Sequence, residues 1–424
     1  MLDISRIRKH PDEVEKKLQY REEAITLDRI LELDERRRDL IGTVEDLKHE
    51  KNEASQQIGT LKKQGQHERA NEIIKNMGSL SERIEELEDE LNEVERELQE
   101  EIDVLPNLPH DSVPVSDDEE DKVIIDEYGE RPEFDFELKN HLELGEELDL
   151  FKFDKASKIA GARFPFYYGD GAAIEMALIN FMFFYQVNEN SYTPVFPPYL
   201  ANKRSYYTSG QLPKFEDDLY HVEKDGLYLN PTSESILANY YRDEILSGND
   251  LPKKFVSFTT CFRREAGSYG EEERGLIRTH QFNKVELFRF VRGEESYTHF
   301  EELITDAESI LQELELHYRK VTLPTCDLAQ QSSKTVDLEV WIPTQGEYYE
   351  VSSISNCEDF QSRRGNMRYR PETDAKPEFM HTLNGSGLAT SRLLVAILEN
   401  NQKKDGSIEL PNRLAEQLNR KELK

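Results

Sequence analysis

Cysteine is scarce in this chain, and the common phosphate-binding glycine loop is missing. The 424 residues include three cysteines, Cys261, Cys326 and Cys357, and none of them forms a C-x-x-C pair. This spacing argues against a disulfide framework and a zinc knuckle, so we expect reduced structural thiols and no zinc. The pattern G-x-x-x-x-G-K-[ST] does not occur, which excludes a P-loop nucleotide site.

Long apolar runs are also absent. The most apolar stretch, 172–187, contains Glu175 and Asn180 and is too short to span a bilayer. The first eight residues lack the apolar region of a secretion signal. We therefore expect a cytoplasmic protein with no membrane segment.

Basic residues are outnumbered by acidic ones. The chain has 54 Lys and Arg against 86 Asp and Glu, which gives a formal net charge of -32. A field of this sign repels nucleic acid, so a nucleic-acid partner must be met by local basic patches. The length exceeds that of a usual single core and predicts two or more domains.

The first third of the chain carries two heptad repeats. Apolar residues recur at alternating steps of three and four over 30–61, where only Arg37 and Lys51 interrupt the seam, and again over 70–98. The polar segment 62–67 separates the runs and predicts an antiparallel coiled-coil hairpin. At about 1.5 Å per residue, this arm is roughly 50 Å long. A coiled coil that only dimerises is the alternative. The internal turn argues against it, because it lets the apolar seams of the two helices pack against each other within one chain.

The tip of the predicted hairpin is its most basic part. Ten acidic residues and two arginines occupy 82–100 on the returning helix, so that helix is unsuited to binding a polyanion along its length. Contact with nucleic acid is expected near the tip or on the outgoing helix. The candidate residues at the tip are Lys62, Lys63, Arg69 and Lys75.

Composition changes near residue 105. Residues at about 106–121 combine prolines with a run of acidic side chains, which is typical of a linker. We predict an N-terminal domain over 1–105, with the hairpin arm at about 28–100. A second domain covers 106–424 and begins with the linker.

The sequence of the second domain predicts an α+β fold. Residues 170–188 read as an apolar helix, and 192–198 as an extended stretch that ends at prolines. Strand-like runs then alternate with polar turns, which favours an antiparallel sheet over βαβ units. These runs cover 226–231, 255–262, 284–290, 334–341 and 347–353.

Two stretches of this domain carry candidate nucleotide chemistry. The first is Phe262-Arg263-Arg264-Glu265 followed by 280–286, and the second is 384–392. They offer paired arginines for a polyphosphate, an aromatic ring for a base, and a glycine-rich turn with another arginine. Strand alternation would direct Arg263, Glu265 and Glu286 to one face.

Because these motifs follow one another in this order along the sequence, the chain resembles the bacterial-type seryl-tRNA synthetases, which are class II aminoacyl-tRNA synthetases. The resemblance spans the hairpin arm, the Leu-Pro-Asn-Leu-Pro-His linker and all three class II motifs, and it includes 210–215, 279–282 and 381–389. It implies a class II catalytic domain built on an antiparallel β-sheet flanked by helices. It also implies a homodimer, in which the helix and strand before Pro198 pack across the two-fold axis.

The resemblance implies that L-serine reacts with ATP to give seryl-adenylate, and that the seryl group passes to the 3′ end of tRNA(Ser), and of tRNA(Sec) where present. Arg263 would hold the α-phosphate and the serine carboxylate together, and Phe282 would stack on adenine. Arg392 would meet the terminal phosphates, and Glu265 the adenine amino edge, so that Arg263, Glu265 and Arg392 form the implied catalytic set. The implied ATP-binding residues are Arg263, Arg264, Glu265, Thr279, Phe282, Glu350, Val351, Ser352, Ser353 and Arg392.

A serine pocket is implied in the same way. Glu234 is suited to the substrate ammonium and Glu286 to its hydroxyl, so alanine should leave buried polar groups unpaired and be rejected. From the residues alone, Glu286 could also form a structural salt bridge to Arg263 or Arg264 when the site is empty, and this pairing does not exclude the contact with serine. The implied serine-binding residues are Thr232, Ser233, Glu234, Arg263, Glu286, Asn384 and Ser386.

A Mg²⁺ ion accompanying ATP is the implied cofactor. Glu350 and Ser353 resemble the family's metal ligands, since a carboxylate and a hydroxyl are hard oxygen donors. Without the resemblance, Glu350 would be interpreted as a solvated strand carboxylate.

Some positions depart from the commoner family pattern. Arg264 replaces a frequent serine, and Thr-Ser-Glu stands at 232–234 where Thr-Ala-Glu is usual. The loop 270–274 is acidic through Glu271-Glu273, where a basic residue usually approaches tRNA, which bears on tRNA affinity rather than on adenylate formation. The segment Cys326-Asp327-Leu328-Ala329 also differs from the usual Gly-Asp-Met/Leu-Gly.

Two other functions remain open on this scaffold. One is a paralogue that activates an amino acid for a carrier protein, which the long arm argues against. The other is a non-catalytic binding protein, which the intact nucleotide-site residues argue against.

Overall fold

The computed structural model describes residues 1–266 and 275–424, and the acidic loop at 270–274 lies outside the described residues. The chain divides into two compact units. One comprises Leu2–Leu105, and the other comprises Pro106–Lys424 together with Met1.

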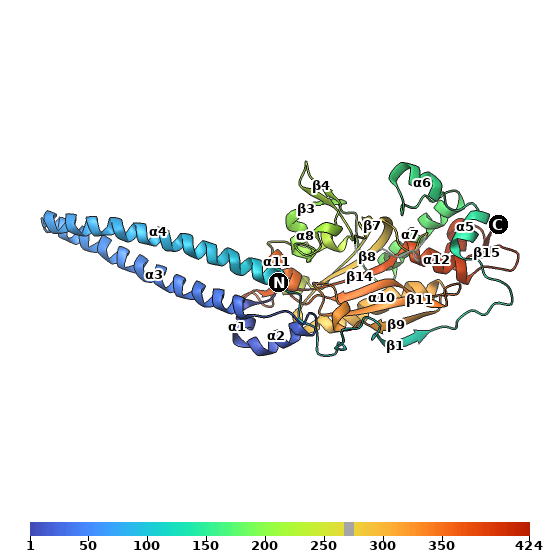
Figure 1. The fold of residues 1–424 in the computed structure, drawn as a ribbon, viewed down its shortest axis with the longest axis horizontal. Helices are drawn as coiled ribbons and strands as arrows, with labels where there is room; N and C mark the ends of the chain where they lie inside the picture. The colour runs from blue at the N-terminus through green and yellow to red at the C-terminus, as the bar shows by residue number, and fades with distance from the viewer. Residues whose placement is uncertain (267–274) are drawn as a thin grey trace. The chain divides into compact units, whose positions relative to one another are not determined.

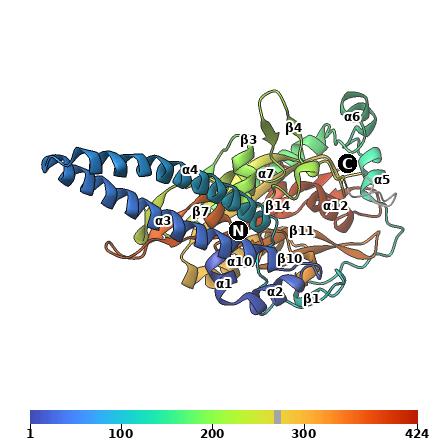
Figure 2. The same cartoon turned by 60° about the vertical axis from the view of Figure 1, so that its left-hand side comes forward.

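The first unit is a helical hairpin with two short helices before it. Helices α1 (Ile4–Lys9) and α2 (Pro11–Gln19) precede the long helices α3 (Asp28–Lys63) and α4 (His67–Asp103). The two long helices lie side by side in opposite directions (Figures 1 and 2). This confirms the predicted hairpin. The buried seam consists of Ile30, Leu33, Leu40, Val44, Ala70, Ile84, Leu87, Val94 and Leu98.

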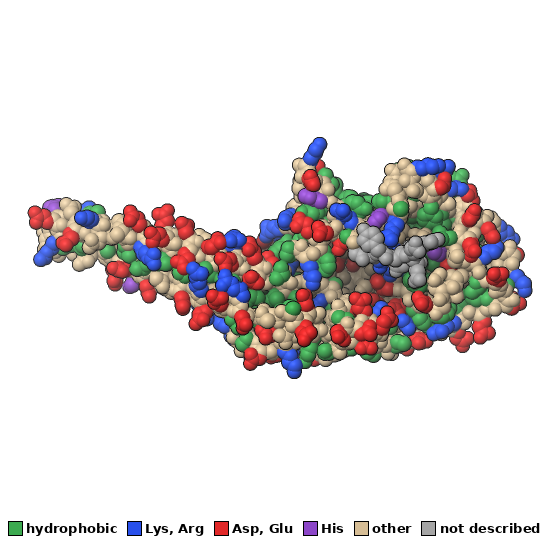
Figure 3. Space-filling view, in the orientation of Figure 1, with side chains coloured by type: hydrophobic (Ala, Val, Ile, Leu, Met, Phe, Trp, Pro, Cys, Tyr) green, Lys and Arg blue, Asp and Glu red, His purple; other side chains and the backbone are tan. Residues whose placement is uncertain are grey.

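Ion pairs also join the two long helices. Arg37, which interrupts the heptad, places its Nε 2.9 Å from Glu95 Oε1, and Lys48 Nζ lies 2.6 Å from Glu88 Oε1. Figure 3 shows acidic and basic side chains interspersed along the visible face of the hairpin. Part of the acidic charge on α4 is therefore paired with α3, although such exposed pairs each contribute little stability.

The second unit is built on an eight-stranded sheet in the order β1-β9-β10-β11-β14-β8-β7-β2. Neighbouring strands are antiparallel except for β2, which pairs with β7 in parallel. The sheet thus confirms the predicted antiparallel class. Its strands are β1 (Val123–Tyr128), β2 (Thr193–Val195), β7 (Lys253–Phe262), β8 (Gln281–Val291), β9 (Tyr318–Thr322), β10 (Lys334–Ile342), β11 (Glu347–Asn356) and β14 (His381–Ala389).

Three small sheets complete the strands of this unit. The predicted strand at 226–231 is β5 (Leu227–Leu229), which does not belong to the main sheet. It pairs with β3 (Leu200–Asn202) and β4 (His221–Val222). The other two sheets consist of β6 (Ile245–Ser247), β12 (Arg368–Arg370) and β13 (Glu378–Phe379), and of β15 (Ile408–Glu409) and β16 (Glu422–Leu423).

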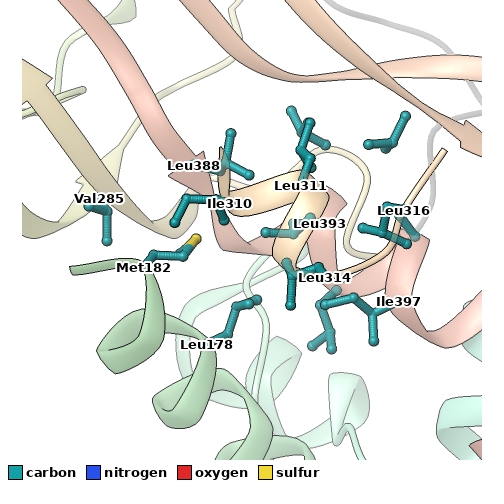
Figure 4. Packing of buried hydrophobic residues seen from close by; sticks show 14 of the residues in the cluster. Leu178, Met182, Val285, Ile310, Leu311, Leu314, Leu316, Leu388, Leu393 and Ile397 are labelled. Atoms are coloured by element: carbon teal, nitrogen blue, oxygen red, sulfur yellow. The ribbon is translucent and has the colours of Figure 1, made fainter. Parts of the chain in front are cut away.

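Helices cover the main sheet. The apolar helix expected at 170–188 is α7 (Asp170–Asn188), and it packs with α10 (Ser296–Glu313) and α12 (Thr390–Asn400) in the largest buried cluster (Figure 4). Leu178 and Met182 of α7, Leu393 of α12 and Ile310 of α10 all belong to this cluster. The shorter helices are α5 (His141–Glu147), α6 (Phe153–Ala160), α8 (Lys203–Ser209), α9 (Glu234–Leu237), α11 (Phe360–Gly365) and α13 (Asn412–Leu418).

The start of the expected linker is packed rather than free. Asn107 is buried, and its Nδ2 donates to the carbonyl oxygens of Gln331 and Cys357, each at 2.9 Å. Its backbone N–H donates to the carbonyl of Gln330 at 2.8 Å. Prolines and a run of charge marked the composition change, but they did not reveal that an asparagine ties this segment to the second unit.

Among the described residues, no helix combines the length and the apolar character needed to cross a bilayer.

Candidate active site

Two adjoining cavities open in the second unit, with volumes of about 530 and 230 Å³. We call them the first and second cavities. They share a set of polar lining residues, so together they form one continuous site. The shared residues are Arg263, Glu265, Lys284, Glu350 and Ser386.

One end of the first cavity is acidic and deeply buried. Glu286 on β8 is 1% exposed; its Oε2 lies 2.5 Å from Lys284 Nζ and accepts a hydrogen bond from Thr232 Oγ1 at 3.2 Å. Glu234 begins α9, and its Oε1 accepts hydrogen bonds from the side-chain amides of Gln331 (3.0 Å) and Gln361 (2.8 Å). Burial, with a further contribution from the charge of Glu286, raises the pKa of Glu234 to about 7.

The ion pair of Glu286 differs from the alternative that the sequence left open. The sequence alternative paired it with Arg263 or Arg264, whereas the structure pairs it with Lys284. Lys284 and Glu286 are two residues apart in one strand, so their side chains point to the same face.

Arg263 and Glu265 line both cavities from the loop after β7. The strand ends at Phe262, and Glu265 has φ +52°, so strand alternation does not direct these side chains, contrary to the prediction. Instead, the backbone N–H of Arg263 donates to the carbonyl of His280 at 3.0 Å. The Arg263 side chain places Nε 3.4 Å from the carbonyl oxygen of Pro231 and its guanidinium 5.1 Å from the centre of the Phe282 ring.

The second cavity combines an aromatic ring with an anchored arginine. Phe282 comes from β8, and Arg392 comes from the first turn of α12, directly after β14. Arg392 donates from Nη1 to the carbonyl of Glu350 (2.9 Å) and from Nε to the carbonyl of Ile277 (3.1 Å). These bonds fix the guanidinium while it still lines the cavity, which is a geometry suited to binding an anion.

Comparison with known proteins shows the family to which the chain belongs. Residues 1–109 match the family model "Seryl-tRNA synthetase N-terminal domain", and residues 214–401 match "tRNA synthetase class II core domain (G, H, P, S and T)". The chain is 47% identical to a serine–tRNA ligase of Syntrophobacter fumaroxidans over 411 residues, which cover 97% of each chain. It is 48% identical to one from Carboxydothermus hydrogenoformans, over 97% of this chain and 96% of that protein.

The chain belongs to the seryl-tRNA synthetase family. It is therefore a ligase of the class II aminoacyl-tRNA synthetases. The crystal structure of seryl-tRNA synthetase from Pyrococcus horikoshii complexed with ATP superposes with a TM-score of 0.94 at 38% identity, covering 100% of this chain and 99% of that one. A Giardia lamblia prolyl-tRNA synthetase shares the fold over 64% of this chain and 54% of its own, with a TM-score of 0.56 at 18% identity.

Most of the residues expected from the resemblance to seryl-tRNA synthetases line the site. The first cavity brings together Thr232, Glu234, Arg263, Glu265, Glu286, Glu350, Ser353, Asn384 and Ser386. The second adds Thr279, Phe282, Val351 and Arg392.

Three expected residues do not line either cavity. The Ser233 side chain is buried, and its Oγ accepts a hydrogen bond from Ser257 Oγ at 2.7 Å. Ser352 Oγ donates to the carbonyl of Ser386 at 2.6 Å, so it ties β11 to β14. Arg264 is exposed, and its backbone N–H donates to the carbonyl of Asp218 at 3.1 Å.

Lys284, Arg278 and Gln331 are site residues to which the sequence argument gave no role. Lys284 is 6% exposed and lines both cavities, and Arg278 places Nε 3.7 Å from Glu265 Oε2. The spacing of Lys284 and Glu286 in an alternating strand was a usable signal. No signal in the sequence pointed to Gln331, because its position beside Glu234 depends on contacts between segments that lie 97 residues apart.

The basic residues expected to contact tRNA lie at the end of α3 and the start of α4, and all four are exposed. They are Lys62, Lys63, Arg69 and Lys75. No ion pair joins them to a carboxylate within the described part of the chain, in contrast to Arg36, whose Nη2 is 2.8 Å from Glu90 Oε1.

Proposed function

We propose that this protein activates L-serine with ATP and transfers the seryl group to the 3′ end of tRNA(Ser), and of tRNA(Sec) in cells that contain it. The observation that carries the proposal is the buried acidic end of the first cavity. The carboxylates of Glu234 and Glu286 and the hydroxyl of Thr232 match the ammonium and the hydroxyl of serine. Arg263 lines this cavity and also the second cavity, which contains the ring of Phe282. The family membership supports the same assignment.

In the proposed serine complex, Glu234 receives the ammonium and Glu286 the hydroxyl. The pKa of Glu234 is raised to about 7, so an arriving cation would stabilise its charged form. Glu286 already holds Lys284 and Thr232 and would accept the serine hydroxyl as one further donor. Asn384 and Ser386 line the same cavity from β14.

In the proposed ATP complex, Phe282 stacks on adenine and Arg392 meets the terminal phosphates. Arg263 lines both cavities, so its planar guanidinium can contact the α-phosphate and the serine carboxylate together. Bringing these two anions into line is the main task of such a site, because phosphoryl transfer depends on positioning and charge neutralisation.

A Mg²⁺ ion fits the donors near the phosphates. Glu350 and Ser353 lie on β11 and both line the first cavity, and a carboxylate and a hydroxyl suit this ion. The bound ion would neutralise phosphate charge. Among the described residues, no three carboxylate, imidazole or thiol groups converge to hold a metal, so an ion here would depend on phosphate oxygens as well.

We further propose that the hairpin tip binds tRNA and that the protein is a homodimer. The exposed basic residues at the tip suit phosphate contacts. Large apolar side chains are exposed on α7 and just after β2, namely Met176 (56%), Phe184 (54%) and Phe196 (77%), as expected of a surface that a second copy covers. A tRNA substrate implies that the protein acts in the cytoplasm, where translation uses its product.

Serine-dependent ATP–pyrophosphate exchange, followed by charging of total tRNA with labelled serine, tests this function. Exchange together with charging is the expected result. Exchange without charging would replace the proposal with the carrier-loading alternative. No exchange with any amino acid would leave the non-catalytic scaffold.

A further inference from the structure

A third cavity of about 400 Å³ adjoins the first one at Glu350 and Ser353. Four carboxylates line it, from Glu119, Asp327, Asp337 and Glu350, against two basic groups. One of these basic groups, Lys122, is already engaged, because its Nζ lies 3.3 Å from Glu339 Oε1. Because acidic groups outnumber basic ones in this cavity, its surface repels a polyphosphate tail unless a cation is bound between them.

Asp337 has an unusual environment within this cavity. It is 4% exposed, and its Oδ1 has no hydrogen-bond partner in the described structure. A buried carboxylate oxygen without a partner is costly, and in native proteins it calls for a specific explanation.

The strand register brings Asp337 to the proposed Mg²⁺ ligands. Asp337 on β10 lies directly opposite Ser353 on β11, and cross-strand partners project to the same face of a sheet. Ser353 hydrogen-bonds the Asp337 carboxyl through its side chain, and Glu350 is the acidic group whose charge acts most strongly on Asp337. A serine hydroxyl that donates to Asp337 keeps its oxygen lone pairs available to a cation.

We infer that Asp337 is a third protein ligand for the divalent cation that accompanies ATP, beside Glu350 and Ser353. The orphan Oδ1 supplies the additional oxygen, and the Ser353 hydroxyl is oriented by the rest of the carboxyl. This inference rests on the proposed function, because the cation arrives with the ATP of that reaction.

The test measures Mn²⁺ binding by electron paramagnetic resonance to the full-length protein, in the presence of a non-hydrolysable ATP analogue. Asp337→Asn should weaken Mn²⁺ binding by about 10- to 100-fold, the range found when supporting groups of metal sites are removed. Glu119→Gln is the matched control, since it removes the same charge from the same cavity, and it should change the affinity by less than about threefold.

Thermal unfolding separates a ligand from a structural residue. The unliganded Asp337→Asn variant should unfold at or above the wild-type temperature, because it replaces an acidic group buried beside Glu350 with a neutral amide of the same shape. The upward shift caused by Mg²⁺ with the ATP analogue should be smaller than in the wild type. Asp337→Cys provides a second test, in which Cd²⁺ should support analogue binding better than Mg²⁺ does, because thiolates prefer soft cations.

The inference would be overturned if folded Asp337→Asn bound Mn²⁺ with an affinity within threefold of that of the wild type. It would also be overturned if Glu119→Gln lost as much Mn²⁺ affinity as Asp337→Asn. If Asp337→Asn fails to fold, a Cd²⁺ preference in Asp337→Cys equal to that of the wild type would overturn it. Failure of the proposed function would look different, since the wild type itself would then not exchange pyrophosphate with serine.

Discussion

The Lys284–Glu286 pair offers a quantitative test of the serine site. At 2.5 Å and an effective dielectric constant of about 20, their attraction is about 7 kcal/mol. Desolvation of two buried ions cancels much of it, but removing one partner of such a pair still costs roughly 3–5 kcal/mol of stability. Glu286→Gln should therefore destabilise the fold by about that amount, measured by denaturant unfolding.

The same substitution should also damage serine recognition. A hydrogen bond from the serine hydroxyl to a carboxylate contributes about 1.5–3 kcal/mol, so kcat/KM for serine in pyrophosphate exchange should fall by about 10- to 150-fold. Binding of an ATP analogue should change little, because the Phe282 and Arg392 end of the site is untouched.

A double variant separates the two effects. Replacing both partners, as Glu286→Gln with Lys284→Met, removes the uncompensated buried charge and should recover most of the missing stability. Serine activity should stay low. Recovery of serine activity along with stability would instead show that the carboxylate acts only as a partner of the lysine.

Three further predictions concern other parts of the molecule. Because the pKa of Glu234 is raised to about 7 and its charged form binds the ammonium, KM for serine should rise as pH falls through about 7, and Glu234→Gln should flatten this profile in exchange assays. Arg263→Lys should lower the exchange rate by about 10²–10³ without changing the circular dichroism spectrum, since an ammonium cannot contact two anions in fixed geometry. The double variant Lys62→Glu, Lys63→Glu should raise KM for tRNA while pyrophosphate exchange stays unchanged. A plot of the logarithm of tRNA affinity against the logarithm of salt concentration should become shallower by about one for each phosphate that these lysines neutralise. Weaker pyrophosphate exchange would point to misfolding instead.

The fold was predictable wherever periodicity was strong. The hairpin followed from two heptad repeats with a glycine break, and the long strands β7, β8, β10 and β11 followed from alternation. The separate small sheet containing β5 was not predictable, because a three-residue strand carries no information on which neighbours it pairs with.

The site was predictable as a set of residue types but not in its internal contacts. Glu265 reaches the cavity through a positive φ in a loop, and no alternation rule covers that. Ser233 and Ser352 lie in the right segments, yet their hydroxyls bond to Ser257 and to the backbone of β14. Those outcomes depend on how distant segments meet, which local sequence does not encode.

We propose that the acidic end of the first cavity selects serine. The most direct test is ATP–pyrophosphate exchange with serine, alanine and threonine in parallel. We predict exchange with serine and a value of kcat/KM for alanine lower by about 10⁴, because alanine leaves buried polar groups unpaired. Alanine exchange within about tenfold of that with serine, or no exchange with serine at all, would show that this end of the cavity does not select serine.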